Sequence, residues 1–178
     1  QLEKGKPSYW YNINIAAIIE TQQAREGSLT ESDSSYTFFC KGKALHEDRI
    51  HGVGFTIKSS LLKQIPCLPT GVNERLLKLC LPVSNKHFII IMSVYVPATM
   101  CTEEIREQFY AALCDMPGND KLVILGTFNT RVSRDEEQWR GVIGKQGNEK
   151  INSNGLLLLS RCIEHNLLIT NTNFWQAD

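Results

Sequence analysis

Polar side chains that could do chemistry stand at the ends of three apolar runs in this sequence. Glu20 ends "NINIAAII", Tyr95 ends "HFIIIMSV", and Thr127 and Asn129 follow "KLVILG". Such runs are typical of buried strands, whose last residues can reach the floor of a cleft. A carboxylate, a phenol, a hydroxyl and an amide gathered there would form a polar reaction site. Each pattern taken alone favours a structural role: Glu20 as a solvated strand end, Tyr95 as a core aromatic, and Asn129 as a turn former.

The composition is that of an ordinary globular chain. Its 178 residues could form one domain, residues 1–178, with a sizeable core. Apolar residues make up 42% and charged residues 21%, so wholesale disorder is not expected. The 19 Lys and Arg residues balance 19 Asp and Glu residues. This neutrality counts against a dedicated nucleic-acid binder, which normally carries a basic excess, but it does not exclude a nuclease with a brief contact.

Cysteine and histidine spacing gives little support for a zinc site. The six cysteines include no C-x-x-C pair, and the four histidines include no H-E-x-x-H spacing. Most cysteines stand in apolar runs, which predicts reduced, buried thiols. The sequence shows no secretory h-region and no long apolar span, so we expect an intracellular protein, nuclear or cytoplasmic, with no membrane partner. It begins with Gln rather than Met, which suggests a trimmed or processed start.

Hydrophobic periodicity predicts more strands than helices. The chain patterns predict strands at 12–21, 52–58, 75–83, 87–97, 121–128 and 167–174, and helices at 102–116 and 154–166. Pro82 is expected to end its strand, and the turn "PVSNK" predicts a hairpin of 75–83 with 87–97. We expect Ser153 or Asn154 to cap the second helix and Asn166 to end it in a left-handed conformation.

The order of these elements predicts the fold class. Strands follow one another in the sequence with few helices between them, and 121–128 reads as a central strand that needs cover on both faces. This order favours an α/β (α+β) sandwich of two packed β-sheets flanked by helices over a doubly wound parallel sheet.

A series of motifs carries a resemblance to a known family. The series contains "NIAAIIET", "GVGFTIK", "RLLKLCLP", "SVYVP", "LVILGTFN" and "NSNGLLLLSRCIEHNLLITNT". It resembles the endonuclease/exonuclease/phosphatase family, and within it the retrotransposon-derived, LINE-type endonuclease branch. The motifs run in the family order through roughly nine-tenths of the chain, which single motifs rarely do by chance.

The resemblance implies a DNase I-like sandwich with its active site at one end of the sheets, where Mg²⁺ assists hydrolysis of a phosphodiester. Glu20 resembles the family's metal-binding glutamate, and Mg²⁺ commonly takes one or two carboxylates while it keeps several waters. Tyr95 matches the tyrosine near the scissile phosphate. Asn129 matches the asparagine that positions the phosphate or the attacking water, whereas Asn154 matches a site position only weakly.

Departures from the family pattern predict impaired catalysis. Family members read G-D-[FL]-N where this chain has Thr127, and a hydroxyl cannot take a proton near neutral pH. Loss of a positioned base typically costs about 10² to 10⁴ in rate. The family's first strand and its last strands, with an aspartate and an Asp-His pair, are not found between residue 1 and Asp178, so we expect a truncated domain. His165 stands late in a predicted helix and is expected to be a dipole or surface residue rather than the site's histidine.

Several functions are compatible with this pattern. The leading hypothesis is an endonuclease-family domain with little hydrolytic activity and a weak or vestigial Mg²⁺ affinity at Glu20. Alternatives are an active nuclease that uses another base or strands from another chain, and a protein-interaction module that binds a partner at an exposed sheet edge or face. A fragment that does not fold stably is a further alternative. Nucleic acid is a possible partner that the net charge does not support.

Overall fold

The computed structural model describes residues 13–30, 35–46, 52–84, 87–96, 121–148 and 150–175. The chain divides into two compact units. Gln1–Tyr95 and Pro117–Gly126 form the first unit, and Val96–Met116 and Thr127–Asp178 form the second. The sequence-based expectation of one domain over residues 1–178 stays a prediction.

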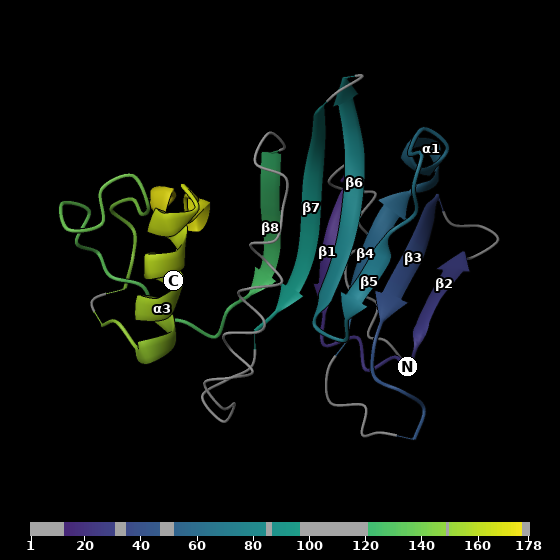
Figure 1. The fold of residues 1–178 in the computed structure, drawn as a ribbon, viewed down its shortest axis with the longest axis horizontal. Helices are drawn as coiled ribbons and strands as arrows, with labels where there is room; N and C mark the ends of the chain where they lie inside the picture. Colours follow the sequence, from purple (N-terminus) through teal and green to yellow (C-terminus); the bar gives the residue numbers. More distant parts are fainter. Residues whose placement is uncertain are drawn as a thin grey trace. The chain divides into compact units, whose positions relative to one another are not determined.

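Most of the regular structure described in the first unit lies in two four-stranded β-sheets (Figure 1). The first sheet has the order β1-β4-β3-β2, and all its neighbouring strands run antiparallel. Its strands are β1 (Ile15–Ile19), β2 (Glu26–Thr30), β3 (Tyr36–Lys41) and β4 (Val53–Lys58). The second sheet has the order β5-β6-β7-β8, with strands β5 (Thr70–Asn73), β6 (Leu76–Ser84), β7 (His87–Tyr95) and β8 (Lys121–Thr127). The expected hairpin of β6 with β7 is confirmed.

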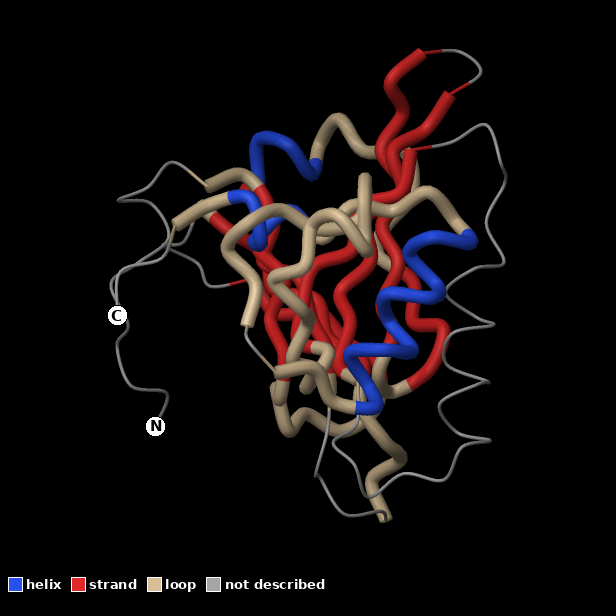
Figure 2. Tube along the Cα trace, turned by 90° about the vertical axis from the view of Figure 1, so that its left-hand side faces the viewer, coloured by secondary structure: helices blue, strands red, loops and turns tan. Residues whose placement is uncertain are grey.

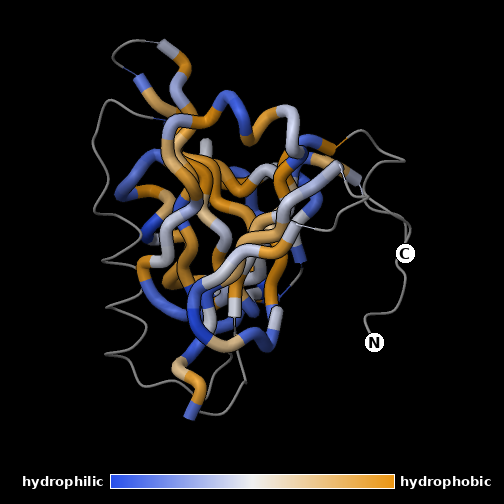
Figure 3. The backbone as a smooth tube through the Cα atoms, turned by 90° about the vertical axis from the view of Figure 1, so that its right-hand side faces the viewer, coloured by the Kyte–Doolittle hydropathy of each residue, from blue (hydrophilic) through white to orange (hydrophobic). Residues whose placement is uncertain are grey.

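The hydrophobic core lies between these two sheets. Its buried residues come from β3 and β4 of one sheet and from β6 and β7 of the other: Phe39, Val53, Phe55, Ile57, Leu77, Leu79 and Ile91. Leu77 and Leu79 are buried on either side of the half-buried Lys78, as the period of a strand with one face toward the core requires. Helix α1 (Ser59–Leu62) adds Leu61 and Leu62 at the margin. Figure 3 shows the hydrophobic residues along these strands. The two packed sheets with few helices confirm the coarse expectation of a sandwich.

Gly126 allows β8 to lie directly against β7. A Cβ atom at this position would collide with the carbonyl oxygen of Val94, and Gly126 has φ +148°, which side chains rarely adopt. Since Val94 is one residue from the end of β7 and Gly126 one residue from the end of β8, the two strands finish at the same edge (Figure 1). β8 is the last strand of its sheet in the described part of the chain, so the expectation that it is central is wrong. Its residues are half-buried or exposed.

The second unit is built around helix α3 (Ser153–Glu164), the longest described helix (Figure 2). Asn166, which follows the C-cap His165 of the helix, adopts the left-handed conformation that we expected, with φ +52°. The amide of Asn166 donates to the carbonyl of Ile163, and the amide of Leu167 donates to that of Cys162. These two bonds form a Schellman motif, which satisfies the last carbonyls of the helix.

The strand expected at 167–174 is wrong. Thr170–Asn173 form a short 3-10 helix, η2. The hydroxyl of Thr172 donates to the carbonyl of Ile169 (2.6 Å) and accepts from the amide of Gly144 (2.7 Å). Threonine and asparagine side chains compete with regular secondary structure in this way, which the periodicity of "LLITNTNF" does not reveal.

Pro82 does not end its strand, because β6 continues to Ser84. An irregularity in the register with β7 lies between Pro82 and Ser84, where a residue without an amide hydrogen is tolerated. The helix expected at 102–116 lies outside the described residues.

The described cysteines are free thiols in differing environments. Cys40 and Cys162 are buried, Cys80 is half-buried and Cys67 is exposed. The expectation of buried thiols is therefore confirmed for only part of the set, while Cys101 and Cys114 lie outside the described residues. Within the described ranges, no helix combines the length and apolar character that a bilayer crossing would require.

A substitution of Gly126 should separate β8 from β7. Gly126→Ala combines the collision with Val94 and an unfavourable φ, so we expect it to lower the free energy of unfolding by about 2 to 4 kcal/mol. Urea denaturation measures this loss. Gly27→Ala in β2 is the matched control, because a Cβ there meets nothing within 4 Å, and it should change stability by less than about 0.5 kcal/mol. Equal effects of the two changes would contradict the proposed close approach.

Candidate functional site

Glu20 stands directly after β1 in a strained turn. It is exposed and has φ +54°, and Gln22 and Arg25 are also left-handed, with φ +52° and +64°. Such conformations cost non-glycine residues energy and persist only where neighbours hold them. The amide of Thr21 donates to the carbonyl of Gly52 (3.2 Å), and that of Arg25 donates to the carbonyl of Lys43 (2.7 Å). The turn that presents the Glu20 carboxylate is therefore fixed by its main chain.

Tyr95 ends β7 and lies at the same end of the first unit as Glu20. Its amide donates to the carbonyl of Arg75 (3.0 Å), and its half-buried side chain packs against the core. The buried hydroxyl of Ser93 donates to the carbonyl of Ile18 (3.3 Å), which links β7 to β1 across the sandwich. Tyr95 follows Ser93 by two residues, and Glu20 follows Ile18 by two residues. The carboxyl ends of β7 and β1 therefore lie at one edge of the first unit (Figure 1). That Glu20 and Tyr95 share a site there stays a prediction.

Thr127 and Asn129 are organised around Val96 in the second unit. The amide of Val96 donates to the carbonyl of Thr127 (2.9 Å), and the side-chain Nδ2 of Asn129 donates to the carbonyl of Val96 (2.8 Å). Asn129 is exposed and left-handed, with φ +47°. The amide and the carbonyl of Val96 are thus both hydrogen-bonded within the second unit. That the four predicted residues, Glu20, Tyr95, Thr127 and Asn129, act on one substrate stays a prediction.

Asn152 is the N-cap of α3, a residue that the sequence interpretation missed. Its Oδ1 accepts from the amide of Gly155 (2.8 Å), so Asn152 caps α3 and the expected cap at Ser153 or Asn154 is wrong. Asn154 is buried in the first turn of the helix. The spacing from Asn152 to Gly155 is that of an ordinary N-cap, a signal that was available in "INSNG".

His165 lies at the C-terminal end of α3, where we expected a dipole or surface residue. Its Nε2 is 3.8 Å from a carboxylate oxygen of Glu164. This position is compatible with the helix-end role expected for it.

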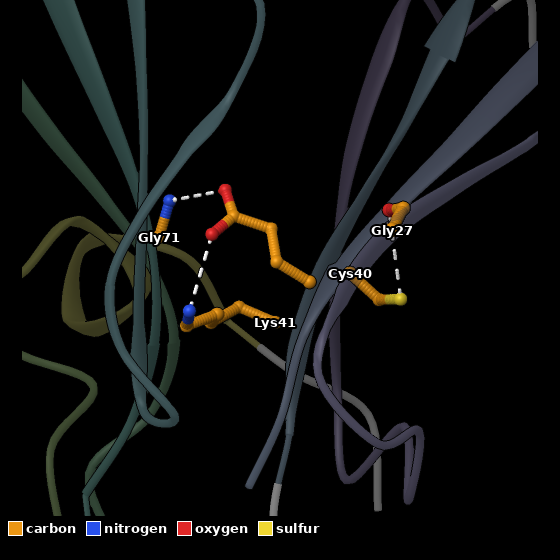
Figure 4. A network of polar contacts seen from close by, with 5 residues as sticks. Gly27, Cys40, Lys41 and Gly71 are labelled. Atoms are coloured by element: carbon orange, nitrogen blue, oxygen red, sulfur yellow. Dashed lines mark hydrogen bonds and ion pairs between the residues drawn. The ribbon is translucent and has the colours of Figure 1, made fainter. Parts of the chain in front are cut away.

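A polar network joins the two sheets near the same end of the first unit (Figure 4). The Glu26 carboxylate accepts from the amide of Gly71 in the other sheet (3.0 Å) and from Nζ of Lys41 (3.1 Å). The hydrogen bond from the Gly71 amide, followed by that from Lys41, lowers the pKa of Glu26 below its ordinary value of 4.5. Nearby, burial raises the pKa of the Cys40 thiol, which donates to the carbonyl of Gly27. Cys40 is therefore a protonated structural thiol.

Metal binding at Glu20 stays a prediction. No group of three His, Cys, Asp or Glu side chains within the described ranges is arranged to hold a metal ion. A Mg²⁺ ion needs fewer protein ligands, because it often binds one carboxylate and keeps its waters. The exposed Glu20 carboxylate on its fixed turn fits that minimal requirement.

Comparison with known proteins supports one relationship. No protein-family model matches the chain. The chain is 29% identical over 170 residues to craniofacial development protein 2 of Bos taurus, a match that covers 93% of this chain and 27% of that protein. The chain therefore spans about a quarter of the length of this relative. The motif series led us to expect a resemblance to this protein, and the similarity supports that relationship.

The lowered pKa of Glu26 predicts a stability that depends on pH. The folded-state pKa lies below that of the unfolded chain, so the network stabilises the fold above the unfolded pKa and is lost as the pH falls through the folded pKa. Glu26→Gln should lower the free energy of unfolding at pH 7 by about 0.5 to 1 kcal/mol, a small value because the Glu26 side chain is 44% exposed and screened by solvent. Wild type and variant should converge in strong acid.

Urea denaturation at neutral and acidic pH measures this convergence. Glu136→Gln is the matched control, since the Glu136 side chain is 46% exposed and contacts Lys145 only at 4.0 Å. The control should lose less stability at pH 7. A difference in the free energy of unfolding between wild type and Glu26→Gln that stays constant with pH would contradict the stabilising role of the Glu26 network.

Proposed function

We propose that this chain is an endonuclease/exonuclease/phosphatase-type domain with a DNase I-like fold, whose phosphodiester hydrolysis is impaired by Thr127. Three lines support the proposal: the ordered motif series, the similarity to craniofacial development protein 2, and the carboxyl ends of β1 and β7 at one edge. The single observation that carries it is the last of these, because it brings Glu20 and Tyr95 to the same end of the sandwich. An intracellular location, nuclear or cytoplasmic, is part of the proposal.

In this proposal each residue has a distinct task. Glu20 would hold Mg²⁺, which supplies Lewis-acid polarisation of a phosphoryl oxygen when bound. The hydroxyl of Tyr95 would donate a hydrogen bond to the phosphodiester. Asn129 uses one N–H for the carbonyl of Val96, which leaves its Oδ1 and its second N–H for the attacking water or the phosphate.

Thr127 limits the reaction in this proposal. Its hydroxyl can accept a hydrogen bond from water but cannot remove a proton near neutral pH. The other predicted residues would still bind a phosphodiester, so binding should survive better than turnover. Nucleic acid is the proposed substrate class, and the neutral net charge of the chain favours a local contact over a tight one.

Restoring a carboxylate at residue 127 tests the proposal. The wild-type chain should cleave supercoiled or abasic DNA slowly in Mg²⁺, and Thr127→Asp should raise the rate by about 10² or more, because a positioned base contributes about 10² to 10⁴. Thr127→Asn is the matched control, since it has the shape of aspartate but cannot act as a base. Nicking assays with single-turnover kinetics measure the rates.

Glu20→Gln tests, in the same assay, whether cleavage depends on a metal ion held by Glu20. It should abolish the gain of Thr127→Asp, and EDTA should do the same. Rapid wild-type cleavage that Glu20→Gln removes would contradict the impairment. A rate for Thr127→Asp no higher than that for Thr127→Asn would contradict the assigned role of residue 127.

A protein-interaction module is a second candidate that one observation favours. All five residues of β2 are exposed, β2 is the last strand of its sheet among the described strands, and Leu29 is 62% exposed. Apolar side chains on an open edge are a common feature of docking surfaces. Partner binding that does not depend on divalent metal and is weakened by Leu29→Lys would support this candidate.

A further inference from the structure

One side chain ties the start of α3 to the segment that carries Asn129. The Oδ1 of Asn152 accepts from the amide of Gly155 in the helix (2.8 Å) and from the amide of Arg131 (3.1 Å). Its Nδ2 donates to the carbonyl of Asn129 (3.4 Å). Both ends of the Asn152 amide are therefore used, with the helix on one side and the Asn129 segment on the other.

The main chain reinforces this attachment. The amide of Asn152 donates to the carbonyl of Arg131 (3.3 Å), and the amide of Asn148 donates to the carbonyl of Val132 (2.9 Å). A Cβ at Gly155 would collide with the carbonyl oxygen of Arg131, so glycine allows the first turn of α3 to approach that segment. Residues 129–132 are thus held by Asn148, Asn152 and Gly155.

The backbone conformation of Asn129 needs such contacts from another segment of the chain. It has φ +47°, a conformation that costs a residue with a side chain energy unless its surroundings fix it. The direction of its amide, whose Nδ2 donates to the carbonyl of Val96, depends on that backbone conformation. Release of the Asn129 carbonyl would free the main chain to rotate and the amide to turn.

We propose that Asn152 is the positioning residue for Asn129. It holds the main chain at Asn129 in the left-handed conformation and so fixes the direction of the Asn129 amide. The catalytic meaning of this arrangement rests on the proposed function, in which Asn129 orients water or phosphate. The positioning itself does not depend on that function.

Two variants separate positioning from helix capping. Asn152→Asp keeps the oxygen that caps α3 and places a negative charge at the helix N-terminus, but it cannot donate to the carbonyl of Asn129. Asn152→Ala loses both functions. In urea denaturation we expect the midpoint of Asn152→Asp to equal or exceed that of wild type, and the midpoint of Asn152→Ala to fall.

Hydrogen exchange of the Asn129 side-chain NH₂, followed by NMR on the full chain, reports the positioning directly. Asn152→Asp should speed this exchange by about three- to tenfold, the effect of one hydrogen bond. Asn148→Asp is the matched control, because the Asn148 side chain accepts only from the nearby amide of Lys150 (3.3 Å). It should leave the exchange at Asn129 unchanged.

The outcomes are decisive in either direction. Unchanged exchange at Asn129 in Asn152→Asp would show that Asn152 is a helix cap only, and equal acceleration by Asn148→Asp would show a general loosening instead of positioning. In the Thr127→Asp background, Asn152→Asp should lower kcat by about three- to tenfold with little change in KM. The reason is that the lost hydrogen bond to the Asn129 carbonyl affects the orientation of the Asn129 amide and not the binding of substrate. If Thr127→Asp is inactive, the proposed function fails while the exchange measurement still decides the role of Asn152.

Discussion

The close main-chain approach of Gly126 to Val94 is the constraint on which the arrangement of strand ends depends. No side chain fits between these two positions, so β8 lies directly beside β7 and the two strands finish together. In the first unit, the hydrogen bond from Ser93 to Ile18 then sets the end of β1 against that of β7. A sandwich whose sheets were joined only by apolar packing would leave these ends free to slide, because hydrophobic contact is not directional. The Gly126–Val94 approach and the Ser93–Ile18 hydrogen bond therefore fix where the strand ends lie.

Two candidate residues occupy strained backbone positions just beyond strands. Glu20 and Asn129 are both left-handed, and each is held by hydrogen bonds from chain segments distant in sequence. Strain of about 1 to 3 kcal/mol per residue persists only where the surrounding structure over-determines it. In the proposed function, these fixed conformations keep Glu20 and Asn129 preorganised for a phosphodiester. The loss of proton transfer is explained by Thr127.

Two of the polar contacts between elements lie near the ends of those elements. Glu26 accepts from Gly71 across the two sheets, and Asn152 joins a helix to a loop. Such contacts add little to the total free energy of unfolding compared with the core. They decide instead which loop conformation is populated, which is the property a binding or reaction site requires.

The sequence by itself determined the features that depend on local pattern. Alternation and apolar runs located β1, β4, β6, β7, β8 and α3, the sandwich of two sheets and the left-handed Asn166, because strand and helix periods are written in neighbouring residues. Only the tertiary structure decided the edge position of β8, the 3-10 turn at Thr172, the continuation of β6 past Pro82 and the double role of Asn152. The continuation of β6 depends on its pairing with the adjacent strand β7, and the others depend on a hydrogen bond or a close approach between segments further apart in the chain. No local pattern encodes these partners.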